Sequence, residues 1–112
     1  MALEPIPIPD HYVGTNKRVF MSAFFLAEGG PSDFAKAVRQ DFLNRAESFS
    51  VPAMVLRVFP HEITLSSEKQ QRLGREMNQW LGEHCVGHWL STAFSYCFTS
   101  QVDAVAFKIR WG

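Results

Sequence analysis

The 112-residue chain has few cysteines, no excess of charge of either sign and no long apolar run. Eleven Lys and Arg balance eleven Asp and Glu. Domains that bind the nucleic-acid backbone usually carry an excess of basic residues, so the balance disfavours nucleic acid as a partner. No segment approaches the about 18 apolar residues of a membrane-spanning helix, and the first residues lack the pattern of a signal peptide. We therefore expect no membrane association.

The only two cysteines are Cys85 and Cys97. If Cys85 begins the strand that holds Cys97, an extended chain separates them by up to ~40 Å at ~3.3 Å per residue. A disulfide needs Cα atoms within about 7 Å of each other. We expect two free thiols, which suits a protein of the reducing cytoplasm.

Motifs of catalysis and cofactor binding are also missing. The chain has no dinucleotide fingerprint, no nucleoside-triphosphate loop and no Gly-x-Ser-x-Gly, so we expect no cofactor and favour a protein that is not an enzyme. Cys85 and His88 have the spacing of a metal-ligand pair, but a structural zinc needs four ligands and the chain offers few others. A helix-to-strand turn explains this cluster better. A small enzyme with Cys85 as nucleophile and His88 as base remains an alternative.

What the sequence does contain is the material for one folded domain. The apolar fraction is 46%, and ten phenylalanines indicate an aromatic core. Pro5, Pro7 and Pro9 predict an extended arm over residues 1–15, which leaves residues 16–112 as a single αβ domain.

Hydrophobic periodicity predicts an α+β fold with the order β-α-β-α-β-β. The predicted elements are strands over 18–27 and 53–59, helices over 34–49 and 66–82, and an antiparallel hairpin over 88–111 with its turn at 99–101. They would form a mixed four-stranded sheet with two helices. The first strand is apolar on both faces, so either helices cover both faces of the sheet or a second copy of the chain covers one of them. The second case predicts a homodimer.

By elimination, we expect a small regulatory or interaction protein that docks onto another protein, such as an inhibitor of the immunity-protein or phage anti-defence kind. Aromatic and Arg side chains dominate binding hot spots, and the loop before the second helix is polar. The candidate contact residues are Tyr12, His61, Glu62, Arg72, Arg75 and Trp89. The alternative from another class is a single-stranded nucleic-acid binder that uses the sheet face around Trp89, with Arg57, Lys108 and Arg110 as cations.

Overall fold

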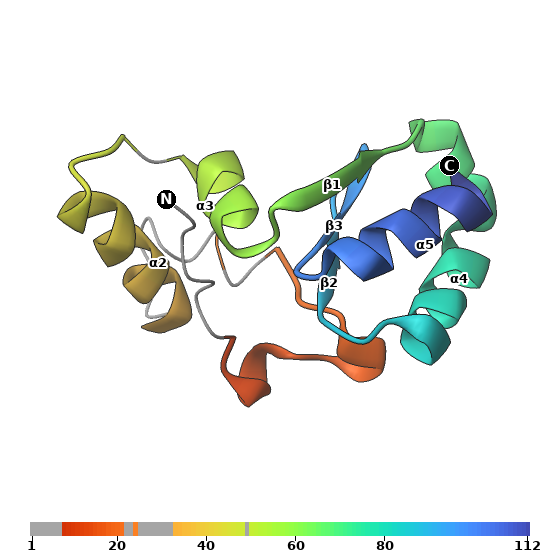
Figure 1. The fold of residues 1–112 in the computed structure, drawn as a ribbon, viewed down its shortest axis with the longest axis horizontal. Coiled ribbons are helices and arrows are strands. Elements are labelled where there is room, and N and C mark those ends of the chain that lie inside the picture. Colours follow the sequence, from red (N-terminus) through yellow and green to blue (C-terminus); the bar gives the residue numbers. More distant parts are fainter. Residues whose placement is uncertain (1–7, 22–23, 25–32, 49) are drawn as a thin grey trace.

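The computed structural model describes residues 8–21, 24, 33–48 and 50–112. Within these ranges the chain forms four α-helices and a three-stranded antiparallel sheet (Figure 1). The elements in chain order are the 3-10 helices η1 (Asp10–Tyr12) and η2 (Thr15–Lys17), then α2 (Asp33–Asn44), α3 (Val51–Val58), β1 (His61–Thr64), α4 (Ser67–His84), β2 (Trp89–Ser91), β3 (Ser95–Phe98) and α5 (Gln101–Trp111). The α+β class is confirmed. The mixed four-stranded sheet with two helices is wrong.

Helix α4 forms where the sequence predicted it. The Ser66 Oγ accepts a hydrogen bond from the backbone N–H of Lys69 at 3.2 Å, so Ser66 caps the helix as its position indicates. Gly82 lies where η2 packs on the helix. A Cβ at Gly82 would be 2.4 Å from the Cγ of Asn16, so only glycine fits at this contact.

Helix α2 also forms as predicted, but it ends at Asn44, before the predicted boundary at Phe49. Ala46 adopts a left-handed conformation with a φ of 56°. The N–H of Ala46 donates to the carbonyl of Leu43, and the N–H of Glu47 donates to that of Phe42 at 3.1 Å. This pattern closes a helix C-terminus, and glycine is its usual residue at the left-handed position.

The predicted strand over 53–59 is wrong, because this segment is helix α3. Ser50 caps it by accepting from the Ala53 N–H, and Pro52 lies in the first turn, where the missing N–H costs nothing. Met54, Val55 and Val58 are buried with helical spacing, whereas Leu56 is 42% exposed. A strand over 53–59 would put Leu56 on the same face as Met54 and Val58. A short apolar run does not distinguish strand from helix, and the cap and the proline decide it here.

The predicted hairpin over 88–111 is also wrong in its second half. The chain turns at residues 92–94, where the Thr92 Oγ1 accepts from the N–H groups of Phe94 and Ser95, so β2 and β3 both come from the predicted first strand. Residues 101–111 form helix α5 instead of the second strand. Ala104, Phe107 and Trp111 recur at the three- and four-residue spacing of a helix, beside the alternation that predicted a strand.

The strand order in the sheet is β1-β3-β2, with β3 in the centre. Its two faces belong to two hydrophobic clusters. Leu90 and Cys97 join the cluster with α2 and α3, whereas Trp89, Tyr96 and Phe98 join the one with α4 and α5. Helices therefore lie on both sides of the sheet (Figure 1).

The N-terminal segment runs along the β2 edge. The Val19 N–H donates to the carbonyl of Trp89 at 2.8 Å, and the Trp89 indole N–H donates to the carbonyl of Asn16 at 2.7 Å. Ile8, Tyr12 and Val13, from the predicted arm, pack on the cluster of α2 and α3. Half of the predicted strand over 18–27, and residues 1–7 of the arm, lie outside the described residues. The described half does not form the predicted strand, because Arg18 and Val19 make isolated bridges, Met21 lies in a turn and Phe24 is helical.

Candidate docking surface

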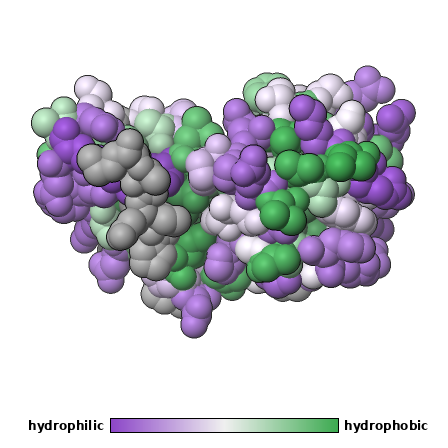
Figure 2. Space-filling view, viewed as in Figure 1, coloured by the Kyte–Doolittle hydropathy of each residue, from purple (hydrophilic) through white to green (hydrophobic). Residues whose placement is uncertain are grey.

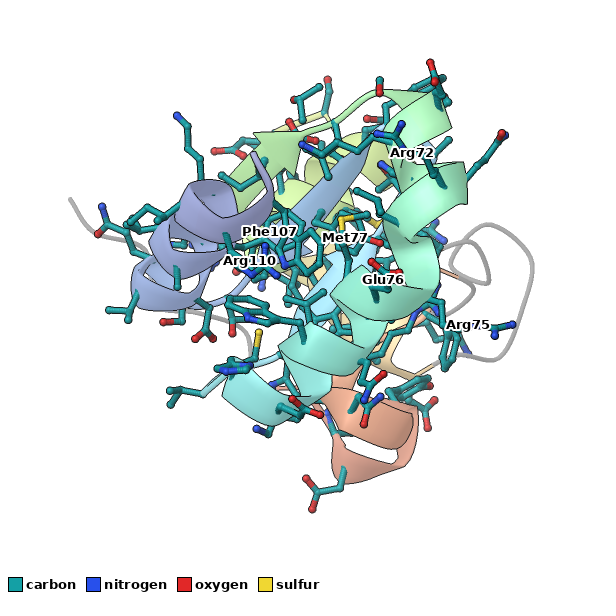
Figure 3. All side chains as sticks on the ribbon, turned by 90° about the vertical axis from the view of Figure 1, so that its right-hand side faces the viewer. Arg72, Arg75, Glu76, Met77, Phe107 and Arg110 are labelled. Carbon is teal, nitrogen blue, oxygen red and sulfur yellow. The ribbon has the colours of Figure 1, made fainter. Side chains whose placement is uncertain are left out.

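Helix α5 is anchored to the domain by its inner face. Phe107 is fully buried, with its ring centroid 4.9 Å from that of Tyr96 and 5.4 Å from that of Phe98. Figure 3 shows Phe107 and Met77 meeting between α5 and α4. Aromatic side chains of this kind bury large areas, so the position of α5 on the sheet is strongly fixed.

A buried carboxylate holds the first turn of α5. Asp103 is 4% exposed, and its two oxygens accept hydrogen bonds from the N–H groups of Val86 (3.0 Å) and Gly87 (2.8 Å). The bonds join α5 to the turn between α4 and β2. Gly87 is required here, because an added Cβ would lie 2.5 Å from the Thr99 Oγ1. The cluster expected to form a helix-to-strand turn does so.

The last turn of α5 is also held in place by side-chain contacts. The Lys69 ammonium donates to the carbonyl of Trp111, and the Arg110 guanidinium lies 4.3 Å from the centroid of the Trp111 ring. A cation at the C-terminal carbonyls complements the helix dipole. The helix is thus held at both ends and along one side.

The outer face of α5 is apolar and exposed. Val102, Val105 and Ile109 are 72%, 50% and 82% exposed, and they are spaced as successive turns of one helix face. With Gln101 and Ala106 they line a shallow depression of about 400 Å³. Hydrophobic side chains gather over α5 in the space-filling view (Figure 2). We call Val102, Val105 and Ile109 the α5 stripe.

The exposed charges of α5 are all positive. Lys108 and Arg110 are exposed, whereas Asp103, the only acid of the helix, is buried under the turn. The α5 stripe therefore has cations beside it and no exposed carboxylate on its own helix.

The predicted contact residues do not form one surface. Arg72 and Arg75 are exposed on α4 (Figure 3), and His61 and Glu62 lie on β1, where the Ser95 Oγ donates to Glu62 at 3.0 Å. The two remaining candidates pack inside the domain. Tyr12 is partly buried, with its ring centroid 5.4 Å from that of Phe34, and Trp89 is 1% exposed. Trp89 is therefore a core residue and offers no surface to a partner.

The site around Cys85 lacks an accessible thiolate. Cys85 is buried at the end of α4, and its burial raises its thiol pKa from 9.0 to about 12, with the Asp103 carboxylate adding to the rise and Lys17 opposing it. The backbone N–H of His88 donates to the Thr99 Oγ1. No group of three or more His, Cys, Asp or Glu with metal-binding geometry occurs in the described ranges. A protonated, buried thiol is a poor nucleophile, which weakens the enzyme alternative.

Both cysteines are free, as expected, for a different geometric reason. Cys85 lies in the cluster of α4 and α5, and Cys97 points into the cluster on the other side of the sheet. Burial raises the pKa of the Cys97 thiol to about 11, while Ser95 lowers it by hydrogen bonding and Glu62 raises it.

The open sheet face that the nucleic-acid alternative requires is absent from the described part of the chain. Stacking of bases needs an open sheet face, and helices cover both faces of this sheet. Lys108 and Arg110 lie on a helix instead of the sheet face where the alternative placed them.

The sequence does not predict the exposed α5 stripe, because the expected hairpin over 88–111 places its residues in a strand. The three-residue spacing of Ala104 and Phe107 is the feature of the sequence that indicates a helix here, and with it the α5 stripe.

Comparisons with family models, with curated proteins and with solved structures give no match. None of the helices in the described ranges is long and apolar enough to cross a membrane.

Proposed function

We propose that this protein is a non-enzymatic regulator that acts by docking the α5 stripe onto another protein. The observation that carries the proposal is the exposure of three aliphatic side chains on a helix whose opposite face is already buried. Helix α5 carries apolar residues on two opposite faces, as a helix with neighbours on both sides does. Only one of these neighbours belongs to the described domain.

The energy available from covering the stripe supports this proposal. The exposed fractions of Val102, Val105 and Ile109 amount to about two whole aliphatic side chains, whose burial contributes about 3–6 kcal/mol. Burial of this size is a useful part of a protein interface, whose remaining contacts come from the polar rim. The partner surface is apolar with carboxylates at its edge, because Lys108 and Arg110 lie beside the stripe.

A second copy of the chain is a less suitable occupant. It would bring an α5 face that carries the same positive charges. The sheet faces, whose exposure would have favoured a homodimer, are both covered. We further propose a cytoplasmic location, supported by two buried cysteines that remain free thiols.

The test compares two double variants as baits in quantitative affinity capture from the source cells. The first is Val105→Glu with Ile109→Glu, which adds two carboxylates to the stripe. The matched control is Leu43→Glu with Leu56→Glu, because these residues are 50% and 42% exposed on α2 and α3. We expect a protein that the unmodified chain and the control recover equally and the α5 variant loses at least tenfold.

Two results would contradict the proposal. One is equal recovery of every captured protein by the α5 variant and the control, with both variants folded. The other is a dimer of the unmodified chain in sedimentation that the α5 variant converts to monomer, since the stripe would then be a contact between copies.

A further inference from the structure

A second concave site lies between the N-terminal segment, α4 and β2. It has a volume of about 310 Å³ and is lined by Gly14, Asn16, Arg18, Phe20, Asn78 and Trp89. The lining holds one cation, two amides and no carboxylate. Its size is at the lower end of the range of small-molecule sites, about 300–1,000 Å³. We call it the Arg18 pocket.

The charge of Arg18 is not compensated within the described part of the chain. Its guanidinium lies 5.0 Å from the ring centroid of Phe20 and 5.5 Å from that of Trp89, and its Nη2 donates to the Ser91 Oγ at 3.0 Å. The Nε is buried without a hydrogen-bond partner, and no described carboxylate pairs with the side chain. A partly desolvated cation of this kind gains from an anion in contact with it.

Asn78 supplies a second donor in a fixed orientation. Its Oδ1 accepts a hydrogen bond from the Tyr96 hydroxyl at 3.1 Å, which leaves the amide N–H groups for a ligand. Arg75 lies one turn earlier on the same side of α4, away from Met77 and Phe107 (Figure 3). Its exposed guanidinium adds positive potential beside the pocket.

The backbone at the rim is strained. Asn16 and Lys17 both have positive φ angles, 62° and 64°. Asparagine adopts this left-handed conformation at little cost, whereas lysine does so at a cost of about 1–2 kcal/mol. The Trp89 indole bond to Asn16 and the Lys17 bond to the carbonyl of Cys85 hold this conformation. Strain of this kind is concentrated at ligand sites, where the surrounding structure maintains it.

We propose that the Arg18 pocket binds a compact organic molecule through one oxyanion group, a carboxylate or a phosphate. The planar guanidinium pairs with either group, and the Asn78 amide adds a neutral donor. The ring of Phe20, which is 49% exposed, offers apolar surface for the body of the molecule, and the buried Trp89 forms part of the lining. This inference does not depend on the α5 stripe.

The test follows the three tryptophan indole N–H signals by NMR during titration of the full chain. The probes are phenyl phosphate, benzoate and uncharged phenol. The Trp89 signal reports on the pocket, and Trp80 and Trp111 are internal controls outside it. We expect the Trp89 signal to move with an anionic probe at about 10 mM, where a site of millimolar affinity is mostly filled, and not with phenol. Movement with phenyl phosphate alone assigns a phosphate, and movement with benzoate alone assigns a carboxylate.

Asn78→Asp places a negative charge in the pocket and keeps an oxygen that can accept from Tyr96. We expect at least tenfold weaker binding of the anionic probe. Gln40→Glu is the matched control, since it makes the same change in net charge at an exposed position on α2 and leaves binding unchanged. If Asn78→Asp does not fold, Arg75→Gln at an exposed position replaces it, with an expected loss of a few-fold.

The proposal is overturned by any of three results. The first result is that neither anion moves the Trp89 signal, and the second is that phenol moves it as much as the anions do. The third is that the folded Asn78→Asp variant binds the anionic probe as tightly as the unmodified chain does.

Discussion

Asp103→Asn tests whether the buried carboxylate holds α5 in place. One carboxylate oxygen accepts a hydrogen bond from the N–H of Val86, and the other accepts one from the N–H of Gly87. Asparagine offers one oxygen only, and its amide group would face the second N–H with a donor against a donor. One N–H in a closely packed turn is then left without an acceptor.

The cost follows from these two bonds. A hydrogen bond to a charged group contributes about 1.5–3 kcal/mol, and a buried N–H without a partner costs about 1–3 kcal/mol. Since the remaining bond to the neutral amide recovers part of this loss, we expect the free energy of unfolding to fall by about 2–4 kcal/mol. For a chain of this size, that corresponds to a Tm lower by roughly 8–16 °C.

Urea denaturation followed by circular dichroism measures this change, with an unchanged m-value as evidence that the unfolded state is the same. Asp33→Asn is the matched control. Asp33 is an exposed acid in the first turn of α2, so it shares the favourable helix-dipole interaction, worth about 0.3–1 kcal/mol, without the two buried bonds. If the two variants unfold with free energies within about 0.5 kcal/mol of each other, the carboxylate does not hold the turn and our reasoning about α5 fails.

Three further predictions concern stability. Gly74→Ala stabilises the protein by about 1 kcal/mol in thermal unfolding, because a Cβ there meets nothing within 4 Å. Gly82→Ala destabilises the protein through the clash with η2, and the reverse order of stabilities would contradict the packing of η2 on α4. Ala46→Gly raises the free energy of unfolding by about 1 kcal/mol, since glycine adopts the left-handed conformation without a Cβ penalty; no gain would mean that the α2 C-terminus ends differently. Burial raises the thiol pKa from 9.0 to about 12 at Cys85 and to about 11 at Cys97, so the unfolded state loses these protons at lower pH than the folded state does. The free energy of unfolding therefore falls as the pH rises above 9, by up to about 1.4 kcal/mol per pH unit for each thiol. Replacing both cysteines with serine should flatten this fall between pH 9 and 10, below the ordinary Tyr pKa of 10.0.

The helices with local signals were predictable from the sequence. Helix α4 has a capping serine at Ser66, a polar outer face and an apolar edge, and all three indicate the same structure. Helix α3 was mistaken for a strand because its eight residues are almost all apolar, which removes the periodicity that separates the two structures. The signals that distinguish it are the capping Ser50 and Pro52 in its first turn.

The site was less predictable than the fold. Arg72 and Arg75 are exposed as expected, because α4 is amphipathic and the spacing of its polar residues predicts which side faces solvent. Trp89 is buried, since its indole N–H finds a partner in the carbonyl of Asn16, 73 positions away. A contact between residues so far apart cannot be read from local periodicity.

The error at α5 and the proposed function have the same physical origin. A helix that contacts the domain on one side only should be amphipathic, and its polar side then identifies it as a helix. Helix α5 has Ala104 and Phe107 inward and Val105 and Ile109 outward, so its apolar residues also fit the alternation of a strand. Local pattern and native structure conflict most where residues serve a purpose other than folding. The stripe contributes nothing to the described core, and exposed apolar patches of this kind mark interaction sites, which is why we propose that a partner covers it.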